Sequence, residues 1–180
     1  MAIATLVDNQ NRFSDLLEQH QGIVGKVART YCWHPDDRDE LSQEIVTQLW
    51  RAFSSYDDTR LFSTWMYRVA LNVSISWVRR NSIRQQHMTA LGDDVHQVAD
   101  TNSYPAEDER IAFLQAFIDS LDSLNRALML LYLDERSYRD IGEILGITET
   151  NVATKISRLK QRVRKQSAEI NGEGANNGTR

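Results

Sequence analysis

The chain has 180 residues, of which 41% are hydrophobic and 26% are charged, and its net charge is −4 at pH 7. No apolar run approaches the roughly 20 residues that span a bilayer, and the first residues lack the pattern of a signal peptide. The single cysteine, Cys32, excludes an internal disulfide and fits a reducing cytoplasm, where we expect the protein. Only 8 Gly and 2 Pro interrupt the chain, and strand-like alternation is missing, so we expect an all-α fold.

Helical periodicity dominates residues 1–81, which we expect to form the first of two small helical domains. The expected helices span residues 11–31, residues 37–53, and a segment that starts at Ser63 or Thr64 and ends near Arg80. In each helix the apolar side chains recur every three or four residues and form one face for a core. The expected core residues are Phe13, Leu16, Leu17, Ile23, Val24, Val27, Ala28, Tyr31, Leu41, Ile45, Leu49, Phe53, Met66, Val69, Ala70, Val73 and Trp77.

Residues 82–106 lose this periodicity, and we expect a flexible acidic linker there, with room for a short helix near its start. The second domain is expected over residues 107–166. Its first two helices are predicted around Ile111, Leu114, Phe117, Ile118 and Leu121, and, after Ser123, around Ala127, Leu128 and Leu131. The polar tail, residues 167–180, is expected to be disordered.

Residues 137–165 predict a short helix, a tight turn and a second, basic helix. Ser137 can cap the first helix, Gly146 can end it, and Thr148 can cap the second. The predicted buried faces carry Ile141, Ile144 and Leu145 in the first helix and Val152, Ile156, Leu159 and Val163 in the second. This order of elements is typical of a helix-turn-helix that reads the DNA major groove.

The charge of this segment favours nucleic acid as its partner. Residues 147–165 carry six Lys and Arg residues against Glu149 alone, in a chain that is acidic as a whole. A basic helix on an acidic protein indicates a localised surface for a polyanion. The alternative interpretation is a helical hairpin whose basic residues form an ordinary solvated face.

Two parts of the chain carry longer motifs. Residues 39–72 contain the runs Asp39 to Glu44, Leu49 to Phe53 and Phe62 to Asn72, and they resemble the second conserved region of bacterial RNA polymerase sigma factors of the extracytoplasmic-function (ECF) group. Residues 121–164 resemble the fourth region of the same proteins. The resemblance implies an alternative sigma factor that binds core RNA polymerase, directs it to promoters through −35 and −10 elements, and helps to melt the DNA.

The second expected helix is the polymerase-binding element by this resemblance, with the β′ clamp helices as its partner and further contacts to the β subunit. The residues implied are Asp39, Glu40, Gln43, Glu44 and Arg51. Pairs four residues apart are neighbours on a helix, so these side chains can form one patch. The alternative is an ordinary solvated helix face.

The third expected helix is the −10 recognition and melting element by resemblance. The residues implied are Phe62, Tyr67, Asn72, Arg79 and Arg80. Aromatic rings can stack on unpaired bases, arginines can hold phosphates, and the Asn amide can both donate to and accept from a base. Trp65 and Trp77 can instead belong to the core. The chain departs from the family pattern at Leu71, where Arg is usual, and at Ser76, where Asp is usual.

The basic helix is the −35 recognition helix by resemblance. The residues implied are Thr150, Asn151, Thr154, Lys155, Arg158 and Arg162, of which Arg162 is better placed for a phosphate than for a base. Arg and Lys suit guanine and Asn suits adenine. Ala153 stands where the family often has Lys.

No catalytic motif occurs, and Cys32 with His34 is too sparse for zinc, so we expect neither enzyme activity, nor a metal, nor a cofactor. The resemblance also implies an anti-sigma factor as a partner and allows the acidic linker to enter the polymerase cleft, although the linker can equally be a solvated spacer. Two other functions stay open: a free-standing helix-turn-helix transcription regulator that acts without the sigma position, and a helical adaptor that binds no DNA.

Overall fold

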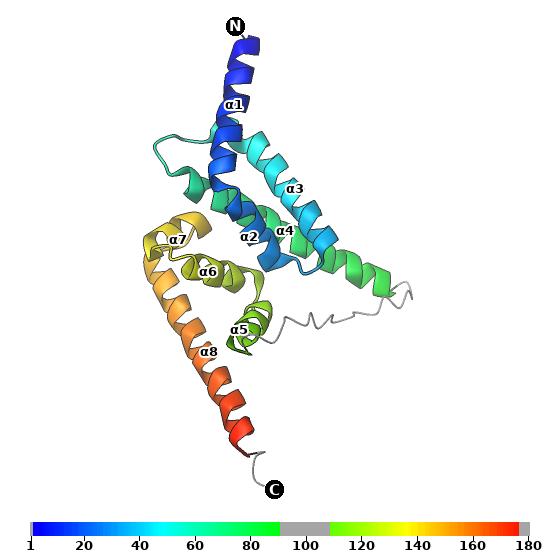
Figure 1. Ribbon diagram of the computed structural model, residues 1–180, viewed down its shortest axis with the longest axis vertical. Coiled ribbons are helices and arrows are strands. Elements are labelled where there is room, and N and C mark those ends of the chain that lie inside the picture. The colour runs from blue at the N-terminus through cyan, green and yellow to red at the C-terminus, as the bar shows by residue number, and fades with distance from the viewer. Residues whose placement is uncertain (1, 91–108, 177–180) are drawn as a thin grey trace. The chain divides into compact units, whose positions relative to one another are not determined.

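The computed structural model describes the backbone of residues 2–90 and 109–176 and the side chains of residues 8–83 and 110–168; in these ranges all regular structure is helical (Figure 1). The expected all-α fold is confirmed for this part of the chain. The helices are α1 (Ala2–His20), α2 (Gly22–Tyr31), α3 (Pro35–Ala52), the 3₁₀ turn η1 (Phe53–Ser55), α4 (Phe62–Ala90), α5 (Glu109–Asp119), α6 (Ser123–Leu133), α7 (Tyr138–Leu145) and α8 (Glu149–Asn176).

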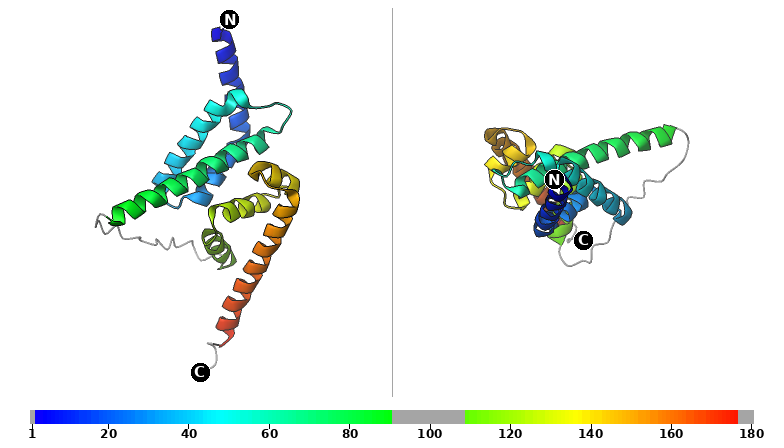
Figure 2. Two further views of the ribbon diagram at one scale, coloured as in Figure 1. Left: turned by 180° about the vertical axis from the view of Figure 1, so that it is seen from behind. Right: turned by 90° about the horizontal axis from the view of Figure 1, so that it is seen from above.

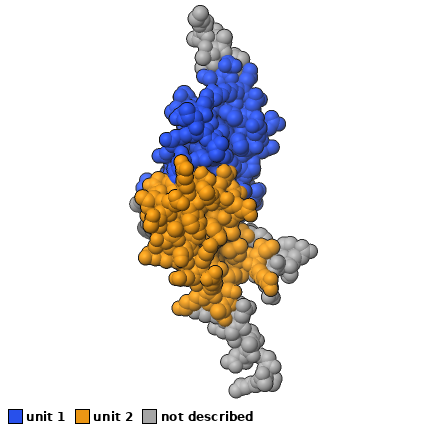
Figure 3. Space-filling view, turned by 90° about the vertical axis from the view of Figure 1, so that its left-hand side faces the viewer, with its two compact units in different colours: residues 1–87, 143–145 blue, residues 88–142, 146–180 orange. Residues whose placement is uncertain are grey.

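The chain divides into two compact units, as Figure 3 shows: residues 1–87 with 143–145, and residues 88–142 with 146–180. Because α7 is one continuous helix, we describe it with the second unit. None of the described helices is both long and apolar enough to cross a membrane.

The first unit is built from α1 to α4, and α4 runs at an angle across α2 and α3 in Figure 1 and in the left view of Figure 2. Its core contains the inward faces of α2, α3 and α4, with Val27, Leu41, Ile45 and Met66 fully buried. The prediction of one uninterrupted helix over residues 11–31 is wrong. The helix is interrupted at Gln21, and Gly22 follows. The Gln21 amide donates to Glu18 O, three residues back, at 3.4 Å, whereas an α-helical amide donates to the oxygen four residues back. Glycine weakens a helix by about 1 kcal/mol, so a change of direction costs least there.

Two other predicted boundaries differ from the structure. Helix α4 continues from Arg80 to Ala90, so the first nine residues of the predicted linker are helical, and residues 91–108 lie outside the described residues. Helix α8 continues to Asn176, so residues 167–176 of the predicted disordered tail are helical as well. Neither extension contains a proline, which would stop a helix. The domain boundaries at residues 81, 106 and 166 stay predictions.

The second unit is a bundle of α5 to α8 around Leu128, Leu131, Ile141 and Ile156. The start of α6 is fixed by a neighbouring side chain. Asp122 caps this helix and accepts hydrogen bonds from the amides of Leu124 and Asn125 at 3.1 and 3.0 Å. Of the apolar residues predicted around α5, Phe117 and Leu121 are buried, and Leu114 and Ile118 are half-buried. Ile111 is 59% exposed, because α5 packs with Phe117 and the residues near its C-terminal end.

Candidate nucleic-acid and polymerase interfaces

The helix-turn-helix in α7 and α8 forms through three local contacts. Ser137 Oγ accepts from the Asp140 amide at 3.1 Å and donates to the Asp140 carboxylate at 2.7 Å. Gly146 ends α7 in the left-handed region, with φ of 69°. Thr148 Oγ1 accepts from the Asn151 amide at 3.2 Å and caps α8. All three predicted caps are confirmed.

Gly142, which sequence reasoning overlooked, brings the two helices together. A Cβ atom at this position would lie 2.7 Å from Ile147 O, closer than side-chain carbons approach a backbone oxygen. The Ile147 amide also donates to Gly142 O at 3.0 Å. The turn therefore closes because residue 142 has no side chain. The sequence signal was present, since a glycine in the middle of a helix usually has a packing reason.

The predicted apolar face of α8 is buried, and it therefore aims the opposite face outward. Val152 and Ile156 are fully buried, Leu159 is nearly so, and Val163, the last of the predicted residues, is half-buried. The predicted recognition residues lie on the other side. Thr150, Asn151, Thr154, Arg158 and Arg162 are exposed, and Lys155 is half-buried. This surface combines hydroxyl, amide and cationic groups, which are the groups that read base edges and hold phosphates.

Arg162 differs from Arg158 in its surroundings. The Arg162 guanidinium lies over the Phe117 ring, 5.6 Å from its centroid, and donates to Ser120 Oγ at 3.4 Å. These contacts join α8 to α5 and to the residue that follows it. Arg162 thus has a packing role within the bundle in addition to any contact with a phosphate.

On α3, the predicted polymerase-binding residues share an outward surface. Asp39, Glu40, Gln43 and Arg51 are exposed, and Glu44 is half-buried. Trp50, which sequence reasoning did not include, lies seven residues after Gln43 and is 42% exposed although its ring packs against Phe13 at 5.2 Å. The helical register of an aromatic residue with Gln43 was the signal for it.

On α4, burial argues against two of the five predicted −10 residues. Phe62 and Tyr67 are buried in the core, with 5% and 0% exposure, so their rings are unavailable to bases. Phe62 joins an aromatic cluster with Phe53, Tyr56 and Trp65, which explains its burial. Aromatic type by itself predicts burial as readily as base stacking.

The other three predicted residues, Asn72, Arg79 and Arg80, are exposed. Arg68 is exposed one turn before Asn72, and Ser76 one turn after it, so Arg68, Asn72, Ser76 and Arg79 follow one stripe of α4. The structure explains the departure from the family pattern at Leu71, because this side chain is 1% exposed and belongs to the core. The departure at Ser76 leaves a small hydroxyl on the stripe itself.

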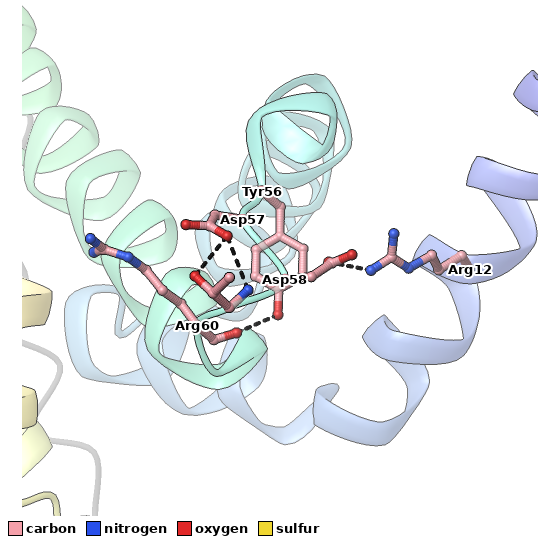
Figure 4. Close-up of polar contacts among 6 residues, drawn as sticks. Arg12, Tyr56, Asp57, Asp58 and Arg60 are labelled. Carbon is pink, nitrogen blue, oxygen red and sulfur yellow. Dashed lines mark hydrogen bonds and ion pairs between the residues drawn. The ribbon is translucent and has the colours of Figure 1, made fainter.

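The connection between α3 and α4 is held by polar contacts, which Figure 4 shows. Arg12 of α1 forms an ion pair with Asp58, and the Tyr56 hydroxyl donates to Arg60 O at 2.6 Å. Asp57 accepts from the Thr59 amide at 3.0 Å and from its hydroxyl at 2.8 Å, and these bonds lower the pKa of Asp57. Burial and the nearby Asp58 carboxylate raise the pKa of Tyr56, which further favours the protonated hydroxyl that donates to Arg60 O. This turn sets where α4 begins.

These features define a class: an all-helical DNA-binding protein in which a helix-turn-helix unit is joined to a second unit with a polar helix stripe. Comparison with known proteins makes the class specific. Residues 16–83 match the family described as Sigma-70 region 2, and residues 107–163 match Sigma-70, region 4. The chain belongs to the ECF sigma factors of bacterial RNA polymerase.

Relatives agree with this assignment. The ECF RNA polymerase sigma factor SigE of Mycolicibacterium smegmatis is 30% identical over 91% of this chain, which spans 64% of that protein's length. The corresponding factor SigW of Bacillus subtilis is 24% identical over 90% of this chain and 92% of SigW.

Two solved structures share the fold. The sigma factor RpoE of Bartonella quintana, in complex with the anti-sigma factor NepR, aligns with a TM-score of 0.68 at 17% identity and covers 86% of this chain and 95% of its own. CnrH, in complex with the cytosolic domain of CnrY, aligns with a TM-score of 0.61 at 20% identity over 91% of this chain and 90% of its own.

Proposed function

We propose that this chain binds core RNA polymerase, brings it to promoters with −35 and −10 elements, and helps to open the DNA. The observation that carries the proposal is the pairing, in one chain, of a Sigma-70 region 2 match with a helix-turn-helix in the region 4 match. A helix-turn-helix alone would serve any DNA-binding regulator. Its combination with a region 2 unit is specific to transcription initiation.

Each surface has a role in this proposal. The exposed residues Thr150, Asn151 and Arg158 of α8 read the −35 element in the major groove. The α4 stripe, with Asn72 and Arg79, holds the opened −10 strand through its bases and phosphates.

The α3 surface, defined here as Asp39, Glu40, Gln43, Glu44, Trp50 and Arg51, binds the β′ clamp helices, and the β subunit completes the polymerase contact. The net charge of −4 opposes DNA binding by the isolated chain, so productive promoter binding requires the polymerase. We place the protein in the cytoplasm, with its polymerase, and assign the nucleotide chemistry to the polymerase and none to this chain. We also propose an anti-sigma factor as a partner. Of the two proteins with a similar fold, RpoE was solved with the anti-sigma factor NepR and CnrH with the cytosolic domain of CnrY.

Run-off transcription with purified core polymerase on a pool of genomic promoters tests the proposal. Transcripts that require both components are expected, and aligned start sites should reveal two spaced elements. Replacing Gln43 and Glu44 together with Ala should lower transcription by weakening polymerase binding, whereas Glu18→Gln on the exposed side of α1 is the matched control. If the polymerase is not stimulated and the isolated chain binds a two-fold symmetric site, the protein is instead a free-standing regulator.

A further inference from the structure

One ion pair in the first unit joins the two helices to which the proposed function gives different partners. Arg80 Nη2 of α4 lies 2.7 Å from Glu44 Oε1 of α3 and 2.9 Å from Glu44 Oε2. The single nitrogen thus contacts both carboxylate oxygens. The Arg80 side chain is 57% exposed and that of Glu44 is 29% exposed, so the pair lies at the surface.

We propose that Glu44 masks Arg80 in the free protein, and that polymerase binding at α3 releases Arg80 for DNA. The inference rests on the proposed function, in which α3 faces the polymerase and α4 faces the promoter. It adds a link between the two: the same carboxylate serves as a polymerase contact and as an internal competitor for a phosphate-binding arginine.

The competition follows from the chemistry of the guanidinium. Carboxylate and phosphate oxygens bind the same N–H donors of arginine, so Glu44 occupies a donor that a phosphate would use. The Glu44 charge also repels any phosphate that approaches Arg80. Both effects lower the DNA affinity of the free protein. Both disappear once a cationic group of the polymerase forms an ion pair with Glu44.

The exposure of the pair suits exchange. A fully buried ion pair would be costly to separate, because one charge would stay unpaired in a low-dielectric interior. A solvated pair is weak and can be displaced by a stronger partner. The adjacent Arg79 is exposed and lies on the α4 stripe, so a released Arg80 would extend a cationic surface that already exists.

The test begins with the full-length chain and a fluorescein-labelled single-stranded oligonucleotide, with affinity measured by fluorescence anisotropy across a salt series. Glu44→Gln is expected to tighten binding roughly threefold to tenfold at low salt. It should also steepen the log–log salt dependence by about 0.7, the increment for one more phosphate contact on a single strand. Glu18→Gln removes the same charge from α1 and should change affinity less than twofold. Glu44→Asp keeps the charge, shortens the side chain, and should tighten binding partly.

Repeating the measurement with Arg80→Gln completes a double-mutant cycle. In the Arg80→Gln background, Glu44→Gln should have no effect beyond that of Glu18→Gln. The proposal is overturned if Glu44→Gln leaves affinity unchanged, or if its effect persists without Arg80. Far-UV circular dichroism confirms folding, and if Glu44→Gln unfolds the first unit, the same cycle with Glu44→Asp decides.

The release step is tested in the holoenzyme. At saturating core polymerase, the coupling between positions 44 and 80, measured as a ratio of promoter affinities, should fall below twofold. Coupling as large as in the free chain would refute release. Failure of the proposed function gives a different result: Arg80→Gln would then leave promoter affinity of the holoenzyme unchanged whatever stands at position 44.

Discussion

Gly142→Ala should destabilise the second unit, although alanine favours a helix. The new Cβ would lie 2.7 Å from Ile147 O, and this oxygen belongs to the backbone of the turn, which cannot rotate away as a side chain can. Relief requires α7 and the turn to move apart. That movement would also strain the hydrogen bond from the Ile147 amide to Gly142 O.

Two opposing terms set the magnitude. Replacing glycine by alanine within a helix gains about 1 kcal/mol from propensity. Forcing an extra carbon into a well-packed site costs about 1–3 kcal/mol, and contact with rigid backbone favours the upper half of that range. The expected net loss is therefore about 1–2 kcal/mol in the free energy of unfolding of the second unit.

The distribution of tryptophan allows the two units to be measured separately. All four Trp residues lie between positions 33 and 77, in the first unit, so their fluorescence reports that unit while far-UV circular dichroism reports both. In urea, Gly142→Ala should lower a circular dichroism midpoint and leave the fluorescence midpoint in place.

Gly25→Ala is the matched control in α2, where the nearest atoms to a new Cβ are 3.6 Å away in the flexible Arg29 side chain. This variant should raise the free energy of unfolding of the first unit by up to about 1 kcal/mol, which would appear as a higher fluorescence midpoint. Unchanged or increased stability of the second unit in Gly142→Ala would refute the close-contact argument.

Three further predictions concern the second unit. Burial opposes the ionisation of Asp122, but hydrogen bonds from Asn125 and the backbone lower its pKa overall. The stability that this cap contributes is therefore present above the pKa that the Asp122 carboxyl has in the unfolded chain, and it is lost as pH falls below about 4. Asp122→Ala should cost about 0.5–2 kcal/mol at pH 7 and flatten this acid dependence in thermal melts. Asn151→Ala should lower run-off transcription by a factor equivalent to about 1–3 kcal/mol, and an unchanged start-site profile with full activity would remove it from the −35 contacts. Arg158→Gln should reduce the salt slope of promoter binding without changing the melting temperature, whereas Arg162→Gln should lower both; equal melting temperatures would show that the Phe117 contact is negligible.

Local sequence determined the parts of this protein that depend on local contacts. The caps at Ser137, Gly146 and Thr148 were predictable because each is satisfied within four residues. The inward face of α8 was predictable because apolar residues at helical spacing leave one stripe for the core. The recognition surface follows from that stripe, since it is the opposite face of the same helix.

The tertiary structure decided what depends on distant partners. Phe62 and Tyr67 could serve a core or a base equally well by residue type, and only the tertiary structure shows that both are buried. The rings of Phe53 and Tyr56, which pack against Phe62, come from outside its helix. The pairing of Glu44 with Arg80 joins residues 36 positions apart, beyond the reach of any helical periodicity. Periodicity orients a side chain about its own helix axis, but the neighbour that it meets is set by how the helices cross.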